Sequence, residues 1–422
     1  MRYTAPKGTK DVLPDQVGAW ESLERLFHRL AGAYGYRELR TPIFERTELF
    51  ARGLGDATDV VQKEMFTFED RGGRSLTLRP ELTAGAVRAY LEHNLAGEGP
   101  VCKLRYLGPA FRQERPQAGR YQQFTQYGVE CFGSRDPAVD AEVIDLALAF
   151  AAGAGLAEVT LHLNSIGCPA CRPAYRALLL AALEERRSDL CPTCRERLAY
   201  NPLRVLDCKS PGCRAVSAGV PLSVDHLCSA CADHFAEVRR HLSALGRPFV
   251  LAPRLVRGLD YYTNTVFEVT APGLGAQDAI LGGGRYDGLI EACGGPPTPG
   301  VGFAGGLERL LLALEAAGAT PKGERVDLIF LAPLGARAKD LAVRLAHEMR
   351  AAGLTADLDY LGRSLKAQLR EADRRGARAV VILGEDEIER GAAAVKWLDG
   401  AGQEEIGFSA LVGYLQDKLA QK

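Results

Sequence analysis

Polar and charged side chains interrupt the segment Leu255–Val269, LVRGLDYYTNTVFEV. The apolar residues that close this segment are typical of a core strand, so Arg257, Tyr261 and Tyr262 are expected near the start of that strand. An arginine offers a planar fork of donors for phosphate or carboxylate, and a phenol both donates and accepts hydrogen bonds. The segment therefore predicts a polar binding site set against a hydrophobic core.

A second group of polar residues lies in Phe111–Gly133, FRQERPQAGRYQQFTQYGVECFG. Because side chains alternate along a strand, one face is expected to carry Gln122, Phe124, Gln126, Gly128, Glu130 and Phe132. Gly128 is expected to leave room for a ligand, and Arg112 and Glu114 lie on the facing arm. The alternative is a hairpin with a solvated face, which the glycine and the aromatic residues on that face disfavour.

Three shorter motifs are also candidates for ligand contact. In LRPELTAG, Thr83 is expected to cap a helix, and Glu81 is either a ligand-binding or a solvated acid. LGGGRYDG, Leu281–Gly288, is either turn chemistry or a backbone surface that a ligand can approach closely. In GFAGGLERLLLAL, Arg309 falls in the first turn of an apolar helix, where a cation is unfavourable unless an anion lies nearby.

Eight of the eleven cysteines form four close pairs, namely Cys168/Cys171, Cys191/Cys194, Cys208/Cys213 and Cys228/Cys231. Taken in sequence order, the first four and the last four would each suit one tetrahedral zinc site. The alternative is reduced thiols buried as small hydrophobic groups. In either case we expect these residues to stabilise a module and to do no chemistry.

The composition of the 422 residues, 47% hydrophobic and 25% charged, is that of a folded globular protein with two or three domains. No apolar run approaches the roughly 18 residues that span a bilayer, and no apolar stretch follows the basic start, so a cytoplasmic location without a membrane is expected. A formal charge of −1 neither requires nor excludes a nucleic-acid partner.

Periodicity and turn signals predict helices and strands in an α+β arrangement. The expected elements are a helix over 17–34, a strand over 36–45, a hairpin around 71–73, a helix over 83–93, strands within 101–133 and a helix from Pro137. We expect an antiparallel-sheet domain over 1–324, with a cysteine-rich insertion module at about 165–250. From 325 to 422 strands and helices alternate, which predicts a separate small α/β domain.

Taken together, these motifs resemble those of the class II aminoacyl-tRNA synthetases and, within that class, the bacterial histidyl enzymes. TPIFE with Pro42 resembles motif 1, FRQER with RYQQF resembles motif 2, and GVGFAGGLERL resembles motif 3. LVRGLDYYTNTVFEV and LGGGRYDG are similar to stretches peculiar to the histidyl enzymes. Leu82 departs from the glycine found in many relatives, which concerns the local shape beside Glu81 and Thr83.

The resemblance implies a class II catalytic domain with an inserted module, followed by an anticodon-binding α/β domain. It implies a histidine–tRNA ligase that activates L-histidine with ATP and Mg²⁺, releases pyrophosphate and transfers the histidyl group to the 3′ end of tRNA(His). Motif 1 implies a homodimer. No editing domain is needed, because a pocket that hydrogen-bonds the imidazole rejects competitors strongly.

The resemblance also implies roles for particular residues. Arg112 and Arg257 would be catalytic and grip the α-phosphate. Histidine would be bound by these two arginines together with Glu81, Thr83, Gln126, Glu130, Tyr261 and Tyr262. ATP would be bound by Arg112, Glu114, Phe124 and Arg309.

Transfer RNA is expected to contact two basic segments. The motif 2 loop supplies Arg115, Gln117 and Arg120, which would meet the acceptor end. In the last domain, Lys366, Arg370 and Arg374 recur every four residues on a helix capped by Ser364 and would meet phosphates. Solvated surfaces are the alternative for both segments.

Two other functions remain open at the level of sequence. One is the non-catalytic, histidine-sensing regulatory subunit of ATP phosphoribosyltransferase, which shares the catalytic fold. It lacks an anticodon-type domain, whereas residues 325–422 resemble a complete one. The other is a zinc-dependent nucleic-acid-binding protein, which would leave the arginines unexplained.

Overall fold

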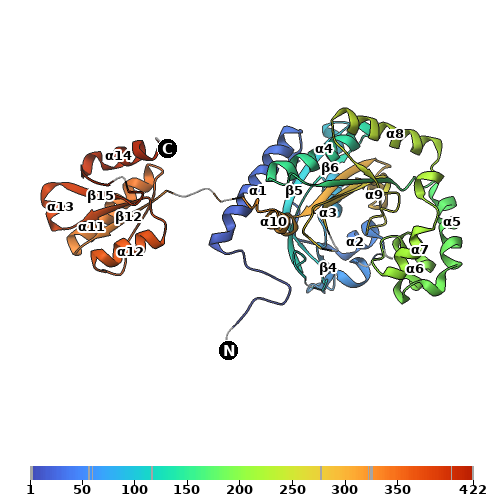
Figure 1. Cartoon of the computed structure of the whole chain (residues 1–422), viewed down its shortest axis with the longest axis horizontal. Coiled ribbons are helices and arrows are strands. Elements are labelled where there is room, and N and C mark those ends of the chain that lie inside the picture. The colour runs from blue at the N-terminus through green and yellow to red at the C-terminus, as the bar shows by residue number, and fades with distance from the viewer. Residues whose placement is uncertain are drawn as a thin grey trace. The chain divides into compact units, whose positions relative to one another are not determined.

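The computed structural model describes residues 3–55, 58, 60–115, 117–275, 278–321, 323, 327–400 and 402–420. The chain divides into two compact units, Met1–Gly323 and Glu324–Lys422 (Figure 1). None of the helices within the described ranges combines the length and the apolar composition that a bilayer crossing requires.

The first unit is built on an eight-stranded sheet that is antiparallel except for the parallel pairs at its two edges. In spatial order its strands are β1 (Arg37–Glu38), β5 (Cys102–Phe111), β6 (Gln123–Phe132), β11 (Gly300–Gly306), β10 (Ala279–Arg285), β9 (Thr263–Thr270), β7 (Thr160–Ser165) and β8 (Val250–Leu251). The predicted antiparallel-sheet α+β class is confirmed.

The strand predicted over 36–45 is wrong as one element, because the chain changes sheets within it. Its start is β1 of the large sheet, and its end begins β2 (Phe44–Arg46) of a three-stranded sheet with β4 (Ser75–Leu78) and β3 (Phe66–Glu69). Pro42 has no N–H for a ladder, and its carbonyl accepts a hydrogen bond from the Arg79 guanidinium at 3.2 Å. The carbonyl of Thr41 accepts another at 2.8 Å.

Helices on one face of the large sheet enclose the main hydrophobic core. They are α1 (Pro14–Ala33), α4 (Pro137–Ala154) and α10 (Leu307–Ala316). Asp136 begins α4 as predicted, since its side chain accepts the N–H of Ala138 at 2.9 Å. Tyr127 and Val129 of β6 point into this core, so the alternate residues of the strand face the opposite side of the sheet.

That opposite side is bordered by α2 (Thr47–Leu54), α3 (Thr83–Glu92) and α9 (Leu289–Ala292), which pack in smaller clusters of buried residues. Five single turns complete the unit: η1 (Val60–Glu64), η2 (Leu95–Glu98), η3 (Arg187–Asp189), η4 (Pro202–Val205) and η5 (Ser223–His226). Helix α3 confirms the helix predicted over 83–93, but it ends one residue earlier.

The cysteine-rich region from about 165 to 250 divides in two. Helices α5 (Arg172–Glu184), α6 (Pro192–Tyr200) and α7 (Pro211–Ala218) enclose a small core of their own. Helix α8 (Ser229–Ala244) instead buries Phe235, Val238 and Leu242 in the main core beside α4. Strand β7, which precedes the region, belongs to the large sheet.

The second unit has a five-stranded sheet in the order β13 (Thr355–Leu358), β12 (Leu328–Pro333), β14 (Ala379–Leu383), β15 (Ala392–Trp397) and β16 (Gly402–Gly407). The first three strands are parallel, and the last two are antiparallel additions that the sequence did not reveal. One face is covered by α11 (Ala336–Ala351), α13 (Glu385–Arg390) and α14 (Phe408–Ala420), and the other by α12 (Leu365–Arg374).

Candidate active site

A cavity of about 570 Å³ opens on the face of the large sheet that lies away from the main core. It is lined by every residue predicted to bind histidine or ATP: Glu81, Thr83, Arg112, Glu114, Phe124, Gln126, Glu130, Arg257, Tyr261, Tyr262 and Arg309. The fold thus gathers side chains from five separate segments into one site. Their individual roles remain predictions.

Glu130 is the most buried acid of the cavity, with 1% of its surface exposed. Its Oε1 accepts a hydrogen bond from the Tyr106 hydroxyl at 2.8 Å, and its Oε2 accepts one from the Tyr286 hydroxyl. Burial raises the pKa of Glu130 to about 8, although hydrogen bonds from Tyr286, Thr83 and Tyr106 oppose the shift. The raised pKa favours the protonated form of this carboxyl near neutral pH.

Neither Tyr106 nor Tyr286 was predicted to take part in the site. Tyr106 lies opposite Gly128 across β5 and β6, and a Cβ on Gly128 would stand 2.7 Å from the Tyr106 hydroxyl oxygen. The prediction that Gly128 makes room for a ligand is therefore wrong, because the space is taken by Tyr106. Only the cross-strand register places Tyr106 opposite Gly128, and the sequence alone does not determine that register.

Glu81, and not Thr83, caps α3. The Glu81 carboxylate accepts the backbone N–H of Thr83 at 2.6 Å and of Ala84 at 2.8 Å, whereas Leu82 occupies the cap position. Burial raises the pKa of Glu81, and these amides and Arg112 oppose the shift. The Thr83 hydroxyl lies 3.3 Å from the Tyr106 hydroxyl, which links the two acids of the cavity through one polar network.

Leu82 has little direct part in the cavity. Its side chain is buried in a small cluster with Tyr106 and Ala110, and its backbone N–H donates to Oε1 of Gln126 at 2.8 Å. At this position, where many relatives have glycine, the Leu82 side chain therefore packs in the core behind the site.

Arg257 enters the cavity from the segment before β9. Its Nη1 donates to Oε2 of Glu268 at 2.8 Å, and its guanidinium lies 5.9 Å from the centre of the Tyr262 ring. Burial disfavours its charge, but Tyr262 and Glu268 raise its pKa overall. A Cβ on Gly282 would stand 2.3 Å from Nη1, so this glycine is needed for the arginine to lie across β10.

Arg112 enters from the end of β5. Its Nε donates to the Pro80 carbonyl at 2.9 Å, its guanidinium lies 5.5 Å from the centre of the Phe124 ring, and Nη1 is 3.6 Å from Glu114. The remaining donors are available to an anion in the cavity. Arg112 and Arg257 come from distant segments of the chain and line the same cavity.

Three tyrosine rings gather beside the acidic part of the site. The Tyr261 ring lies 4.5 Å from the Tyr262 ring and 5.4 Å from that of Tyr286. Burial raises the pKa of Tyr261 well above its usual range, so its phenol stays neutral. A ring of neutral phenols beside two buried carboxyls offers both donors and acceptors to a small polar ligand.

Arg309 lies in the first turn of α10, as predicted, and its Nε donates to the Ala279 carbonyl at 2.9 Å. Burial lowers its pKa, and the acids that favour its charge are Asp278 and Glu268. Glu308, which no pattern singled out as a ligand, also lines the cavity and accepts the Thr125 N–H at 2.8 Å. Burial raises the pKa of Glu308 to about 7.

The residues predicted to meet tRNA are on the surface. Arg115 and Gln117 are exposed outside the cavity, whereas Arg120 lines it and donates to Glu114 at 3.1 Å; Pro116 lies outside the described residues. Lys366, Arg370 and Arg374 are exposed on α12. Ser364 stands at the start of that helix but makes no side-chain cap, contrary to the prediction.

The cavity is also lined by residues of the inserted region that the sequence gave no reason to assign to it. They are Arg197, Arg204, Asp207, Cys208 and Lys209. Asn201 joins the same region to the Arg257 segment, because its Nδ2 donates to Oδ1 of Asp260 at 2.6 Å.

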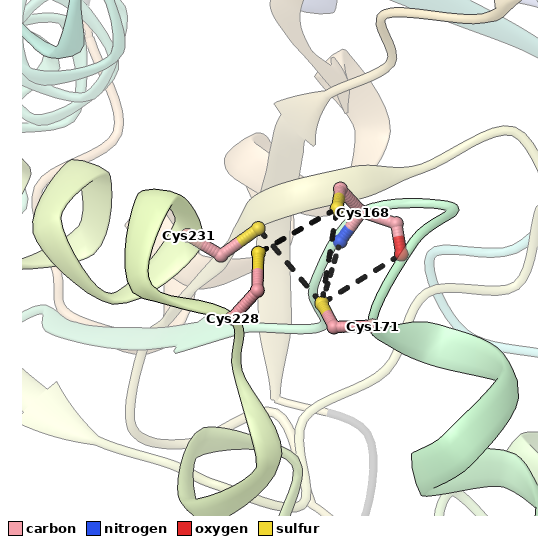
Figure 2. A group of neighbouring side chains, drawn as sticks. All are labelled: Cys168, Cys171, Cys228 and Cys231. Carbon is pink, nitrogen blue, oxygen red and sulfur yellow. Dashed lines mark hydrogen bonds between the residues drawn. The ribbon is translucent and has the colours of Figure 1, made fainter.

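The eight paired cysteines form two clusters of four, but not in the predicted grouping. The outer cluster is Cys168, Cys171, Cys228 and Cys231 (Figure 2), and the inner cluster is Cys191, Cys194, Cys208 and Cys213. The grouping predicted in sequence order is wrong. The first cysteine pair meets the last pair, and the two middle pairs, which lie between them in the sequence, meet each other.

These features define the chemistry that the cavity can support. Buried carboxyls and phenols suit a ligand that carries N–H groups, and two arginines suit an adjoining phosphate or carboxylate. An antiparallel sheet bearing this cavity, followed by a small α/β unit, defines a class II aminoacyl-tRNA synthetase.

A family model described as "Histidyl-tRNA synthetase" matches residues 8–207 and 210–310, and one described as "Anticodon binding domain" matches 329–418. The chain belongs to the histidyl-tRNA synthetase family.

Curated relatives carry the likeness over the full length. The chain is 55% identical to a histidine–tRNA ligase of Moorella thermoacetica over 98% of each chain, and 52% identical to one of Pelotomaculum thermopropionicum over 99% of each. It is also similar to the crystal structure of apo Staphylococcus aureus histidyl-tRNA synthetase, with 39% identity, a TM-score of 0.82, and coverage of 98% of this chain and 99% of that one.

A structure described as an ATP phosphoribosyltransferase regulatory subunit/histidyl-tRNA synthetase from Bacillus halodurans shares the fold. It is 22% identical, with a TM-score of 0.65, over 91% of this chain and 99% of that one. This likeness shows the fold alone, and the identity to the curated ligases makes the regulatory alternative the less supported of the two.

Proposed function

We propose that this chain is a histidine–tRNA ligase that activates L-histidine with ATP and transfers the histidyl group to the 3′ end of tRNA(His). The observation that carries the proposal is one cavity with Glu81 and Glu130 among phenols and with Arg112 and Arg257 lining the same space. The full-length identity to curated histidine–tRNA ligases supports the same activity.

In the first step, the carboxylate of histidine attacks the α-phosphorus of ATP in line, and pyrophosphate leaves as the bond to the β-phosphate oxygen breaks. ATP enters as its Mg²⁺ complex, in which the metal neutralises the outer phosphates. Negative charge spreads over the α-phosphate oxygens, and Arg112 and Arg257 stabilise that charge because their guanidinium groups are already in place. Phe124 and Arg309 hold the adenine ring between them, and Glu114 accepts from its amino group.

In the second step, a hydroxyl of the terminal ribose of tRNA attacks the carbonyl carbon of histidyl-adenylate. The ester bond forms, AMP leaves with the bonding electron pair, and the hydroxyl proton passes to the released phosphate or to solvent. The chain's own part is to hold the acyl group still while the hydroxyl approaches.

Selection of histidine rests on Glu130, Glu81 and the tyrosines. When histidine binds, Glu130 gives up its proton to solvent and the carboxylate accepts a hydrogen bond from an imidazole N–H in its place. A side chain without ring nitrogens leaves these groups unpaired, which costs about 10⁴-fold or more in specificity. Thr83, Gln126, Tyr261 and Tyr262 complete the histidine pocket.

The remaining assignments concern larger partners. Residues 1–324 carry the catalytic work, and 325–422 bind the anticodon region of tRNA(His). Arg115, Gln117 and Arg120 meet the acceptor end, and Lys366, Arg370 and Arg374 meet phosphates. As an enzyme of translation, the chain works in the cytoplasm.

The chain forms a homodimer through the motif 1 region. Three large apolar side chains are exposed on and beside the three-stranded sheet: Ile43 at 44%, Phe44 at 47% and Phe68 at 44%. Exposed apolar side chains in this region favour burial against a second copy. We expect sedimentation of the intact chain to give a dimer, and we expect Phe44→Glu to shift it toward monomer.

The test of the ligase activity is histidine-dependent exchange of radioactive pyrophosphate into ATP, followed by charging of total tRNA with histidine. Exchange that responds to histidine but not to the other amino acids supports the proposal. Histidine binding without exchange would support the regulatory alternative instead.

A further inference from the structure

Each four-cysteine cluster has the dimensions of a tetrahedral metal site. In the outer cluster, the Sγ atom of Cys168 lies 3.8 Å from that of Cys171 and 3.9 Å from that of Cys228. Within each cluster the four Sγ atoms all lie within 4.8 Å of one another. In the inner cluster, the Sγ atoms of Cys191 and Cys208 are 3.9 Å apart. Zn–S bonds of about 2.3 Å in a tetrahedron place the sulfurs roughly 3.8 Å apart.

The thiols are not arranged as disulfides, since an S–S bond of about 2.05 Å would bring two sulfurs much closer. Backbone N–H groups instead point at sulfur, from Cys168 to the Sγ of Cys171 at 3.3 Å and from Cys191 to the Sγ of Cys213 at 3.2 Å. Such donors stabilise the thiolate form that a metal ion requires.

The inserted helices also need an added source of stability. Helices α5, α6 and α7 form a small core that includes Cys194 and Cys213, so two of the inner thiols replace apolar side chains in it. A unit of roughly 50 residues buries too little apolar surface to be robust alone, and structural metal is a common remedy.

The inner cluster lies beside one end of the segment that supplies Arg257 and Tyr261. Between its ligands Cys194 and Cys208, Asn201 donates to the Asp260 carboxylate at 2.6 Å. Arg204 of the same loop lies against Gly258, where a Cβ would stand 3.3 Å from its Nη1. The inner cluster therefore fixes the backbone that holds residues 258–260.

The outer cluster lies beside the other end of that segment. The guanidinium of Arg172, which follows ligand Cys171, donates to the carbonyl of Tyr262. The Sγ of Cys231 lies 3.1 Å from Oδ1 of Asn264, a residue with a left-handed backbone (φ 48°) whose N–H donates to the Gly167 carbonyl at 2.9 Å. The outer cluster therefore fixes the chain just after Tyr262.

We propose that the two clusters each bind a Zn²⁺ ion through four cysteine thiolates, and that together they hold the segment 257–264 in the shape that binds histidine. The metals do no chemistry on the substrate. The positioning role rests on the proposed ligase function, whereas the metal sites themselves do not.

The metal sites are tested by measuring zinc in the full-length chain purified without chelators. The expected content is two zinc ions per chain, falling to one in Cys171→Ser, which removes an outer ligand, and to one in Cys194→Ser, which removes an inner one. Cys293→Ser, outside both clusters, keeps two. Exchange of zinc for Co²⁺ gives thiolate-to-cobalt charge-transfer absorption, which reports sulfur ligands directly.

The positioning role is tested with a variant that keeps both metals. Asn201→Ala removes the link to Asp260, and we expect it to retain two zinc ions while kcat/KM for histidine in pyrophosphate exchange falls about tenfold, with KM for ATP within about twofold. Cys194→Ser lowers kcat/KM at least as far, and Cys194→His, which offers an imidazole ligand, recovers part of the loss.

Different outcomes overturn different parts of the proposal. A chain without bound zinc and without cobalt–thiolate absorption contradicts the metal sites and favours plain buried thiols. If Asn201→Ala binds two zinc ions and its kcat/KM for histidine is unchanged, the positioning role is contradicted. If Cys194→Ser fails to fold, the metal content of the unaltered chain and the kinetics of Asn201→Ala still decide. Absence of any histidine-dependent exchange refutes the ligase function and leaves the metal count unaffected.

Discussion

Replacement of Arg257 by histidine removes one of the two guanidinium groups proposed to hold the α-phosphate. Arg257 is preorganised by a 2.8 Å hydrogen bond to Glu268 and by the Tyr262 ring, so its charge needs no rearrangement when ATP reacts. Loss of one such preorganised contact costs about 10²–10³ in rate, or about 2.7–4 kcal/mol. We therefore expect Arg257→His to slow histidyl-adenylate formation by about 10²-fold or more.

The assay is the single-turnover formation of histidyl-adenylate by the purified chain at saturating histidine and ATP, with thermal unfolding measured in parallel. Arg257→Lys is the matched variant, because it keeps the charge and loses the planar fork. The rate of Arg257→Lys is expected to lie between that of the unaltered chain and that of Arg257→His. The fold should be little changed, since Glu268 remains partly exposed to water.

An unchanged rate in Arg257→His would refute the assigned role, because the contacts of this arginine with Glu268 and Tyr262 would then serve only the structure of the site. A large drop in melting temperature with a normal rate per folded molecule would assign Arg257 to stability alone. Both results are distinguishable from the predicted loss of rate in a folded protein.

Three further outcomes follow from the contacts of the first unit. The pKa of Glu130 is raised from 4.5 to about 8 in the folded protein, so the folded state holds this proton more tightly than the unfolded state. The resulting contribution to the free energy of unfolding is fully present below about pH 4.5 and is lost as the pH rises toward 8. Glu130→Gln should flatten the fall of melting temperature across that range and abolish the proton release on histidine binding measured by calorimetry in different buffers. Gly302→Ala should lower stability by about 1–3 kcal/mol and weaken histidine binding, since its Cβ would stand 2.0 Å from Oε2 of Glu130, and a normal histidine affinity would contradict the packing. Asp136→Ala should lower the free energy of unfolding by about 1 kcal/mol without changing kcat/KM, because it removes only the cap to Ala138, and an unchanged chemical denaturation midpoint would contradict that assignment.

The sequence predicted features that depend on local periodicity. Alternation along β6 placed Gln126 and Glu130 on the cavity side and left Tyr127 for the core, as the structure has them. The start of α4 at Asp136 and the hairpin of β3 and β4 were also predicted, because caps and turns are decided by a few adjacent residues.

Features that depend on distant partners could not be predicted. The space at Gly128 belongs to Tyr106, which strand register brings there from β5. The grouping of the cysteines follows from the path of the chain around α6 and α7, and spacing alone allows several groupings. The same path brings Lys209 to the cavity, with no signal in its neighbours.

The most direct measurement is a crystal structure of the chain with histidine and a non-hydrolysable ATP analogue bound. The account predicts the imidazole ring within hydrogen-bond distance of Glu130 and the α-phosphate between the guanidinium groups of Arg112 and Arg257. A histidine bound with its ring away from Glu130, or a nucleotide whose α-phosphate touches neither arginine, would contradict it.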